Sequence, residues 1–314
     1  MKALSRKKLA QIPPAVWIIF ILVIFFGSQV DGFFSGSNLR TFLITAAPLL
    51  VLAFGQTLVI MTQGTDLSVG SIISTVSVLW VLLMKMGMPA AAAMVLSVLA
   101  GGVAGLFNGI LVAKLKIPAF IATLGTQNIF ASVALVLSNN TTIHISKNIF
   151  SNITYGNFLF IPICVWIAII CFCISLLILK RTRFGMKIVA LGGNSEALNL
   201  AGVNVASKMI LAFVFAGIMA GISGILMACR IESGNPLAGE GWEFNSIAAV
   251  LLGGTSMRDG NGTVVGTIFG VFLIQIVKTG LNQIGLESIY QNALIGGTVL
   301  SAIIVDACIK RVRD

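Results

Sequence analysis

Residues 42–84 read FLITAAPLLVLAFGQTLVIMTQGTDLSVGSIISTVSVLWVLLM. Two long apolar runs, 42–62 and 68–84, are joined here by a short polar segment that carries the carboxyl group of Asp66. Each run predicts a membrane-spanning helix, because a hydrocarbon core about 30 Å thick needs about 20 apolar residues of helix. A charge at bilayer depth costs roughly 2.5–3.5 kcal/mol, so Asp66 is expected against protein, beside water or in a functional site.

The composition of the whole chain excludes a soluble domain. Hydrophobic residues make up 57% of the sequence, charged residues make up 10%, and the mean hydropathy is +1.03. These values indicate an all-α polytopic membrane protein surrounded by lipid. The net charge of +10 does not indicate a nucleic-acid partner, because the basic residues lie in the gaps between apolar runs and form no common surface.

About ten apolar segments are long enough to be helices that cross or enter the membrane. The eighth is short and ends near glycine. The predicted ranges are 15–34, 42–62, 68–84, 90–113, 119–138, 159–179, 208–229, 244–256, 262–280 and 290–309.

The distribution of lysine and arginine predicts the orientation of these helices. Four basic residues within 1–14 precede the first run, which places this segment in the cytoplasm. Ten spans then bring the C-terminus back to the cytoplasm, and they leave most of the 20 basic residues inside. The bias supports an even number of spans and does not by itself prove ten. The five basic residues predicted outside are Arg40, Lys85, Lys147, Arg230 and Lys278.

Catalytic motifs lack the partners they need. Residues 221–224 read GISG and match the G-x-S-G of intramembrane serine proteases, but the only histidine, His144, lies in a polar loop. All five cysteines lie in or beside apolar runs and are expected to be core residues. The chain has no H-E-x-x-H and no P-loop. We therefore expect no enzyme activity, no metal and no cofactor, and any ATP hydrolysis must come from another subunit.

Small residues recur at four-residue spacing in several predicted helices, and such stripes let helix backbones approach closely. Two interpretations stay open: packing inside the bundle, or a homodimer seam or narrow pathway. The glycines are Gly101, Gly105 and Gly109, then Gly217 and Gly221, and finally Gly262, Gly266 and Gly270.

The loop 180–207 is the only sizeable one on the predicted cytoplasmic side. Asn194 or Ser195 can cap a helix start, Glu196 suits its first turn, and Gly202 suits its end. The predicted helix has about two turns and is too short to be stable alone. We expect its flanks or a partner to support it.

This loop and three other stretches resemble bacterial sugar permeases of the ribose type, in the superfamily that also contains branched-chain amino acid permeases. The resemblance runs from about residue 35 to 306, and its motifs stand in order. One departure is Met257-Arg258-Asp259 before Gly260, where the family tends to have small residues. The three stretches are GQTLVIMTQGTDLSVGS at 55–71, PAFIATLG at 118–125, and IAAVLLGGTS at 247–256 followed by Gly266-Thr267.

The resemblance implies a single transmembrane permease domain over residues 1–314, in the bacterial cytoplasmic (inner) membrane. It implies a homodimer that works with a cytoplasmic ATP-binding cassette subunit and an extracytoplasmic sugar-binding protein. The cargo would be a ribose-like pentose or a hexose, and galactose, arabinose and xylose stay open. An alternative keeps the bundle but makes it a secondary transporter or channel that uses Asp66 as a cation or proton site.

The resemblance also implies roles for three segments. The junction at 64–71 is a signature whose carboxylate either caps the third helix or acts in the pathway or its gate. The loop 230–243 gathers charge where a binding protein would dock. The residues are Asn194, Ser195, Glu196, Ala197, Leu198, Leu200 and Gly202 for coupling to the ATPase; Gly64, Asp66, Ser68, Gly70 and Ser71 for the junction or gate; and Glu232, Glu240, Trp242 and Glu243 for docking.

Overall fold

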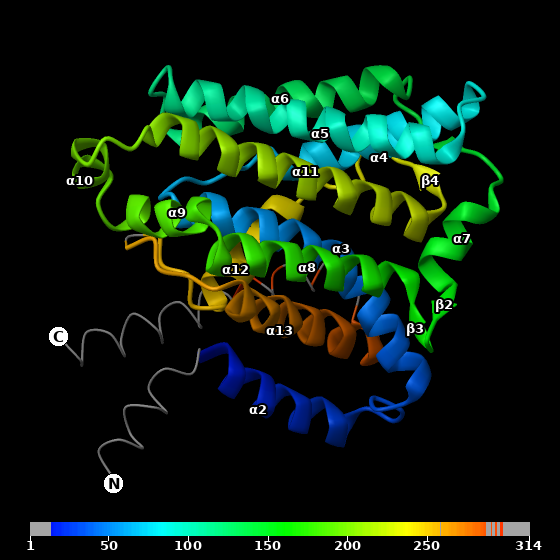
Figure 1. Cartoon of the computed structure of the whole chain (residues 1–314). Helices are drawn as coiled ribbons and strands as arrows, with labels where there is room; N and C mark the ends of the chain where they lie inside the picture. The colour runs from blue at the N-terminus through cyan, green and yellow to red at the C-terminus, as the bar shows by residue number, and fades with distance from the viewer. Residues whose placement is uncertain (1–13, 258, 287–289, 291–292, 294–295, 298–314) are drawn as a thin grey trace, which may run out of the picture.

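The computed structural model describes residues 14–257, 259–286, 290, 293 and 296–297. Helices dominate these residues, and the longer ones run side by side through the molecule (Figure 1). Six of them are long and apolar enough to cross a membrane, which confirms the all-α polytopic class. They are α3 (Gly36–Met61), α5 (Ala90–Ala113), α6 (Ala119–Leu137), α8 (Ile163–Arg181), α11 (Val205–Ile231) and α13 (Val264–Gln283).

The remaining elements are shorter. Three are apolar helices, namely α2 (Pro14–Gln29), α4 (Val69–Lys85) and α12 (Trp242–Leu252). The others are α7 (Asn148–Tyr155), α9 (Arg183–Gly193) and α10 (Ser195–Leu200). Two antiparallel pairs of two-residue strands join loops: β1 (Ile143–His144) with β4 (Ser233–Gly234), and β2 (Asn157–Phe158) with β3 (Ile161–Pro162).

Several predicted boundaries differ from the observed ones, and side-chain caps explain two of them. Helix α3 begins at Gly36, six residues before its apolar run, because the Ser35 side chain accepts the N–H of Asn38 at 3.3 Å. Helix α11 begins at Val205 because Asn204 caps it. Helices α7 and α9 were not predicted, and the range 290–309 lies mostly outside the described residues.

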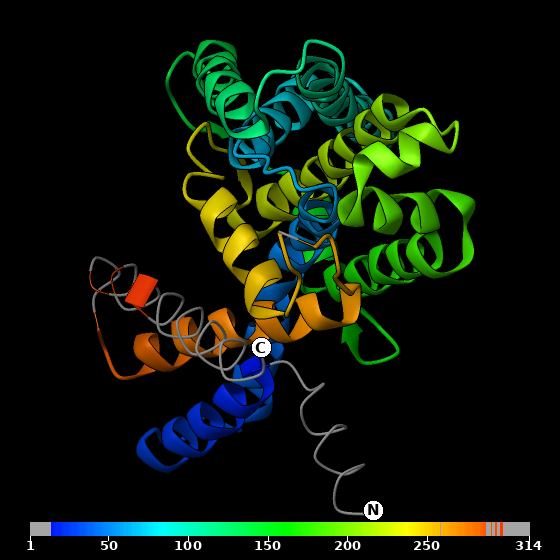
Figure 2. The ribbon, with the colours of Figure 1, turned by 90° about the vertical axis from the view of Figure 1, so that its left-hand side faces the viewer.

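The bundle has two distinct ends in Figure 1. The α10 end carries α9 and α10, and the α7 end carries α7, β2 and β3 (Figure 1). Seen from the α10 end, α2 and α13 lie on the side of the bundle opposite to α5 and α6 (Figure 2). Helix α2 packs against α13, which in turn packs against α3 and α12.

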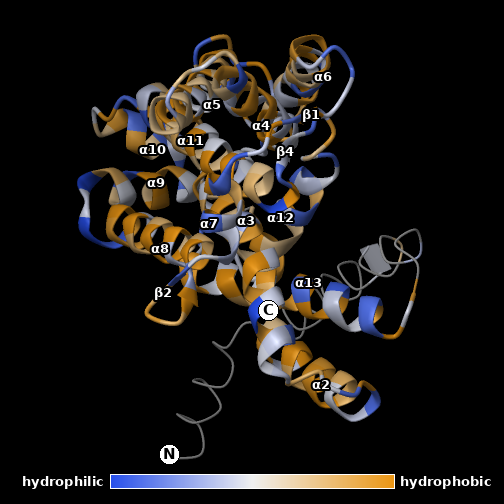
Figure 3. Ribbon diagram, turned by 90° about the vertical axis from the view of Figure 1, so that its right-hand side faces the viewer, coloured by the Kyte–Doolittle hydropathy of each residue, from blue (hydrophilic) through white to orange (hydrophobic). Residues whose placement is uncertain are grey.

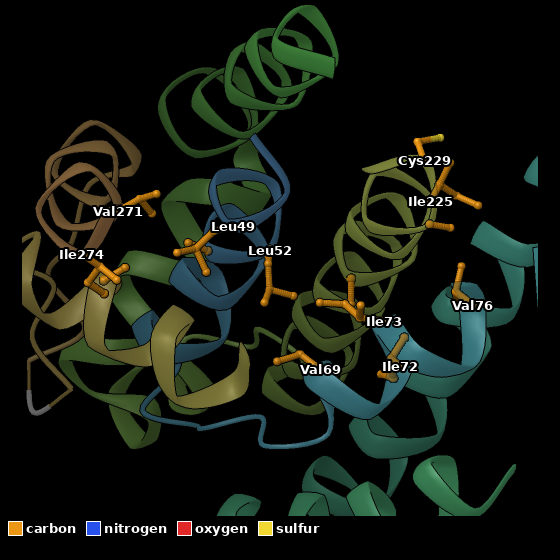
Figure 4. Close-up of a cluster of buried hydrophobic side chains, with 14 of the residues drawn as sticks. Leu49, Leu52, Val69, Ile72, Ile73, Val76, Ile225, Cys229, Val271 and Ile274 are labelled. Atoms are coloured by element: carbon orange, nitrogen blue, oxygen red, sulfur yellow. The ribbon is translucent and has the colours of Figure 1, made fainter. Parts of the chain in front are cut away.

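The largest apolar core lies where α3, α4, α11, α12 and α13 meet. Outside it, α5, α6 and α8 present mainly apolar residues on the surface (Figure 3), and Val103 and Val136 are 64% and 75% exposed. Such outward apolar faces suit contact with lipid. Figure 4 labels core side chains on four helices: Leu49 and Leu52; Val69, Ile72, Ile73 and Val76; Ile225 and Cys229; and Val271 and Ile274.

Helices α5 and α11 cross at glycines, so their backbones lie very close. A Cβ atom added to Gly101 would stand only 2.6 Å from the carbonyl oxygen of Gly217, and one added to Gly217 would overlap the carbonyl of Gly101. Gly221 also faces α5, at Val98. These contacts confirm that the stripes in both helices pack inside the bundle, which was one of the two interpretations.

Candidate functional site

The two-turn helix predicted in the long loop is present as α10. The Asn194 side chain accepts the N–H of Ala197 at 2.9 Å, so Asn194 is the cap and Ser195 is the first helical residue. Gly202, at φ +77°, follows the end of the helix. None of the residues of α10 is buried, and Leu200 is 89% exposed. A large apolar side chain therefore stands uncovered at the tip of the α10 end.

An open hollow of about 620 Å³ lies beside α10. Ser195, Glu196 and Gly202 line one side of it, and Lys116 from the α5–α6 connection lines another. Three of the predicted coupling residues thus border a concave surface that carries charges of both signs. Such a surface can accept a protruding element of another protein.

Helix α9 connects α10 to the core. Its first turn is capped by Thr182, whose hydroxyl accepts the N–H of Gly185 at 3.1 Å. Ile188 is completely buried, which fixes α9 to the bundle. The Gln63 side chain donates a hydrogen bond to the carbonyl of Gly192 at 2.8 Å. Helix α9 is therefore linked at its end to the segment between α3 and α4.

Asp66 lies in that segment and is fully buried. Its Oδ1 atom accepts the backbone N–H of Ser68 at 2.9 Å and the Ser68 hydroxyl at 2.7 Å. The Ser68 hydroxyl oxygen in turn accepts the amide N–H of Asn108, on α5, at 2.7 Å. Asp66 thus faces protein, one of the three environments that its charge allows.

Two further helices hold the backbone around Asp66. The Gln56 amide, on α3, donates to the carbonyl of Asp66 at 3.2 Å. The Thr123 hydroxyl, on α6, accepts the N–H of Leu67 at 3.1 Å. Sequence reasoning gave no role to Gln56, Asn108 or Thr123, although Gln56 and Thr123 lie within the motif stretches 55–71 and 118–125. The available signal was that each is a polar residue in an otherwise apolar run.

The hydrogen bonds define what Asp66 does at the start of α4. Ser68 occupies the N-cap position, and its side chain makes no capping bond to the first turn. Asp66 holds the cap residue itself and does not bond the N–H groups inside α4. Burial raises the pKa of the Asp66 carboxyl, and the hydrogen bonds from Ser68 oppose that shift. Its Oδ2 atom has no hydrogen-bond partner in the described part of the chain.

The rest of the signature packs against the start of α12. A Cβ atom at Gly70 would overlap the Glu243 carboxylate and the Gly239 carbonyl, so only glycine fits this contact. Ser71 donates its hydroxyl to the carbonyl of Ser68 at 2.8 Å. Gly64 follows the last turn of α3, where its N–H bonds the carbonyl of Val59.

The loop 230–243 places its four predicted docking residues in different environments. Glu232 and Glu240 are exposed at the surface. Glu243 is only 3% exposed and accepts a hydrogen bond from the Gln127 amide at 3.2 Å, so its prediction as a docking residue does not fit the structure. The chain turns inward after Glu240, which carries Glu243 under the surface. Trp242 is half-buried and lines a cavity.

Ser223, the serine of the G-x-S-G match, has a structural partner. Its hydroxyl donates to the carbonyl of Pro48 at 2.8 Å, and its side chain is buried between α3 and α11. His144 is exposed on β1. The contact explains the serine through helix packing.

Comparison with known proteins decides the family. The model of the family described as branched-chain amino acid transport system / permease component matches residues 38–303. The chain belongs to this family. The resemblance that the four motifs indicated is thereby confirmed, and the chain is an integral membrane protein.

Curated relatives cover almost the whole chain. The Ribose import permease protein RbsC of Escherichia coli (strain K12) is 35% identical over 292 residues, which cover 92% of this chain and 91% of the relative. RbsC of Bacillus subtilis (strain 168) is 36% identical over 92% of this chain and 90% of its own length. The D-allose transport system permease protein AlsC of Escherichia coli (strain K12) is 32% identical, over 94% and 91%. No solved structure matches the chain.

Proposed function

We propose that this chain is the permease subunit of an ATP-binding cassette importer for a small sugar, in the bacterial inner membrane. The main observation that supports this proposal is the exposed helix α10, with Leu200 uncovered at its tip, in a chain that belongs to a permease family. Ribose and D-allose, which the names of the relatives give as their cargo, define the substrate class as pentoses and hexoses.

The proposed topology has ten spans within one domain, residues 1–314, with both termini in the cytoplasm. It assigns the α10 end, with 180–207, to the cytoplasm, and the α7 end, with 230–243, to the extracytoplasmic side. The outward apolar faces of α5, α6 and α8 support contact with lipid. A second copy of the chain would complete the pathway. No nucleic acid takes part.

A separate subunit would hydrolyse the ATP that drives transport, because the sequence carries no P-loop. The chain itself needs no cofactor and performs no catalysis. The ATPase would contact Glu196, Ala197 and Leu200 and displace α10, with Asn194, Ser195, Leu198 and Gly202 maintaining the shape of the helix. Helix α9 would transmit the displacement through Gly192 and Gln63 to the segment that holds Asp66. Such a switch requires the partner to contact the two states differently.

On the other side, the sugar-binding protein would dock on the rim formed by Glu232 and Glu240. Both carboxylates are exposed, and rim charges orient a partner before contact. Glu243 takes no part in this surface because it is buried. Docking would release the sugar toward the α7 end of the bundle.

Reconstitution tests this function. The chain is purified with a candidate ATP-binding cassette subunit and a candidate periplasmic sugar-binding protein, and the complex is placed in proteoliposomes. Uptake of labelled ribose, D-allose and arabinose is measured with and without ATP. We expect uptake only when ATP and both partners are present. Uptake driven by an ion gradient without ATP would contradict the proposal and would favour a secondary transporter that uses Asp66.

A further inference from the structure

A polar cavity of about 750 Å³ opens at the α7 end. Its walls come from the α2–α3 connection, α3, the end of α11, the start of α12 and α13. This volume is within the range of about 300–1,000 Å³ that is usual for small-molecule sites. Figure 3 faces this end and shows hydrophilic segments along α13. Lining residues that carry charges, amides or an aromatic ring include Asp31, Arg230, Trp242, Asn245, Gln275 and Lys278.

Two of the residues that line this cavity are cations. Arg230 and Lys278 are both partly buried, and they are close enough to repel each other. In the described residues, neither side chain makes a hydrogen bond or an ion pair. A partly buried cation pays a desolvation cost that no ion pair offsets here, so the two side chains mark a candidate site for a ligand rich in hydrogen-bond acceptors.

The other basic residues predicted on this side of the membrane are accounted for. Arg40 donates hydrogen bonds to the carbonyl of Tyr155 at 2.5 Å and to the side-chain oxygen of Asn157 at 3.1 Å. Lys85 and Lys147 are exposed. In the part of the chain that the structure describes, Arg230 and Lys278 are thus the two basic side chains on this side that are partly buried and make no hydrogen bond or ion pair.

The remaining wall of the cavity is suited to a sugar. Gln275 is held in place because its amide donates to the hydroxyl of Thr45 at 2.6 Å. Trp242 and Asn245, both from the start of α12, also line the cavity. An aldose has hydroxyl oxygens that accept hydrogen bonds, hydroxyl protons that can be donated to a carboxylate such as Asp31, and an apolar C–H face that stacks on an aromatic ring.

We propose that this cavity binds the sugar after the binding protein releases it, with Arg230 and Lys278 donating hydrogen bonds to its hydroxyls and Trp242 packing against its C–H face. The inference rests on the proposed function and deepens it, because it names the residues of the entry site.

The test compares cavity variants with matched controls in the reconstituted importer, with labelled ribose and D-allose as probes. Trp242→Leu and Lys278→Gln change the cavity. Trp17→Leu, at an exposed residue of α2, and Lys85→Gln are the controls. We expect uptake by the cavity variants to fall about tenfold. A fall of this size corresponds to the loss of roughly one charge-assisted hydrogen bond or ring contact. Assembly with the ATPase should stay within about twofold of wild type for both variants, and so should the stimulation of ATP hydrolysis by the binding protein for Lys278→Gln, which lies outside the loop 230–243.

The conservative variants Trp242→Phe and Lys278→Arg should retain most of the uptake, which separates sugar contact from a folding defect. Uptake by Trp242→Leu and Lys278→Gln equal to that of the controls would overturn the inference. A fall in uptake matched by an equal fall in assembly would overturn it as well. If the wild-type importer takes up neither sugar, the proposed function has failed for these substrates, and this result is distinct from a failure at the cavity.

Discussion

The Oδ1 atom of Asp66 accepts two hydrogen bonds from Ser68, from the backbone N–H at 2.9 Å and from the hydroxyl at 2.7 Å. The same hydroxyl accepts a hydrogen bond from Asn108, so the carboxylate is connected to α5 through one intermediate side chain. This arrangement explains how a charge can sit between two apolar helices. Ser68 supplies some of the hydrogen bonds that water would otherwise provide.

Replacing Asp66 with alanine is expected to destabilise the protein more than replacing it with asparagine. An asparagine oxygen can still accept the Ser68 N–H, whereas alanine leaves that N–H and the Ser68 hydroxyl without their acceptor. We expect Asp66→Ala to cost about 1–3 kcal/mol of stability and Asp66→Asn less. Thermal unfolding of the detergent-purified variants measures their relative stability.

The same pair of variants separates the two roles that the sequence left open. An Asp66→Asn protein that melts like wild type but has lost ATP-dependent uptake would assign the carboxylate to the gate. An Asp66→Ala protein with unchanged thermal unfolding would show that the hydrogen bonds to Ser68 contribute little to stability.

The α5–α11 crossing should not accept a methyl group. A Cβ atom at Gly217 would overlap the carbonyl of Gly101, so Gly217→Ala must push two helices apart. We expect a loss of about 1–3 kcal/mol, as overpacking typically costs. Gly125→Ala on α6 is the control, because nothing lies within 4 Å of its added Cβ. The yield and melting temperature of the folded protein are the measurements. Equal yields and melting temperatures for the two variants would contradict the close crossing.

The sequence predicted the helices through their apolar runs, and the errors have local causes. The first residues of α3 include Ser37, Asn38 and Arg40, which an apolar criterion excludes although Ser35 caps the helix. Helix α7, which reads NIFSNITY, is a short amphipathic segment inside a polar loop. Only tertiary contact decides such segments, because Phe150 packs against Trp80 at a ring distance of 5.4 Å.

The candidate sites were predictable where the function depends on a local segment. Helix α10 was predicted because its capping residue and the glycine that follows its end lie within one short stretch of sequence. The hydrogen-bond environment of Asp66 was not predictable, because Gln56, Asn108 and Thr123 come from three other helices. The same reason explains the error at Glu243. Its burial depends on Gly70 and Gln127, which are distant in the chain.

Removing the exposed apolar side chain of α10 should weaken the complex with the ATPase without affecting the fold. Leu200 is 89% exposed, so Leu200→Ser removes no internal contact. We expect the recovery of the ATPase on the purified permease to fall about tenfold, in line with the loss of an apolar anchor at an interface. Leu237→Ser is the matched control, because Leu237 is 59% exposed in the loop 230–243. A loss of ATPase that is equal in the two variants would argue against α10 as the contact.

Charge reversal at Glu240 should weaken the docking of the sugar-binding protein in a salt-dependent way. Glu240 is exposed, so Glu240→Lys changes the potential of the rim without burying a charge. At about 0.05 M salt we expect the affinity to fall about threefold to tenfold, and at about 0.5 M the variant and the wild type should converge, because screening shortens the range of the interaction. The affinity of the sugar-binding protein for the permease in nanodiscs is measured at both salt concentrations.

Glu196→Lys at the α10 end is the control, since it makes the same charge change on the opposite side of the bundle. A deficit of Glu240→Lys that persists at high salt would indicate a direct contact and not steering, whereas equal binding at both salt concentrations would remove Glu240 from the docking surface.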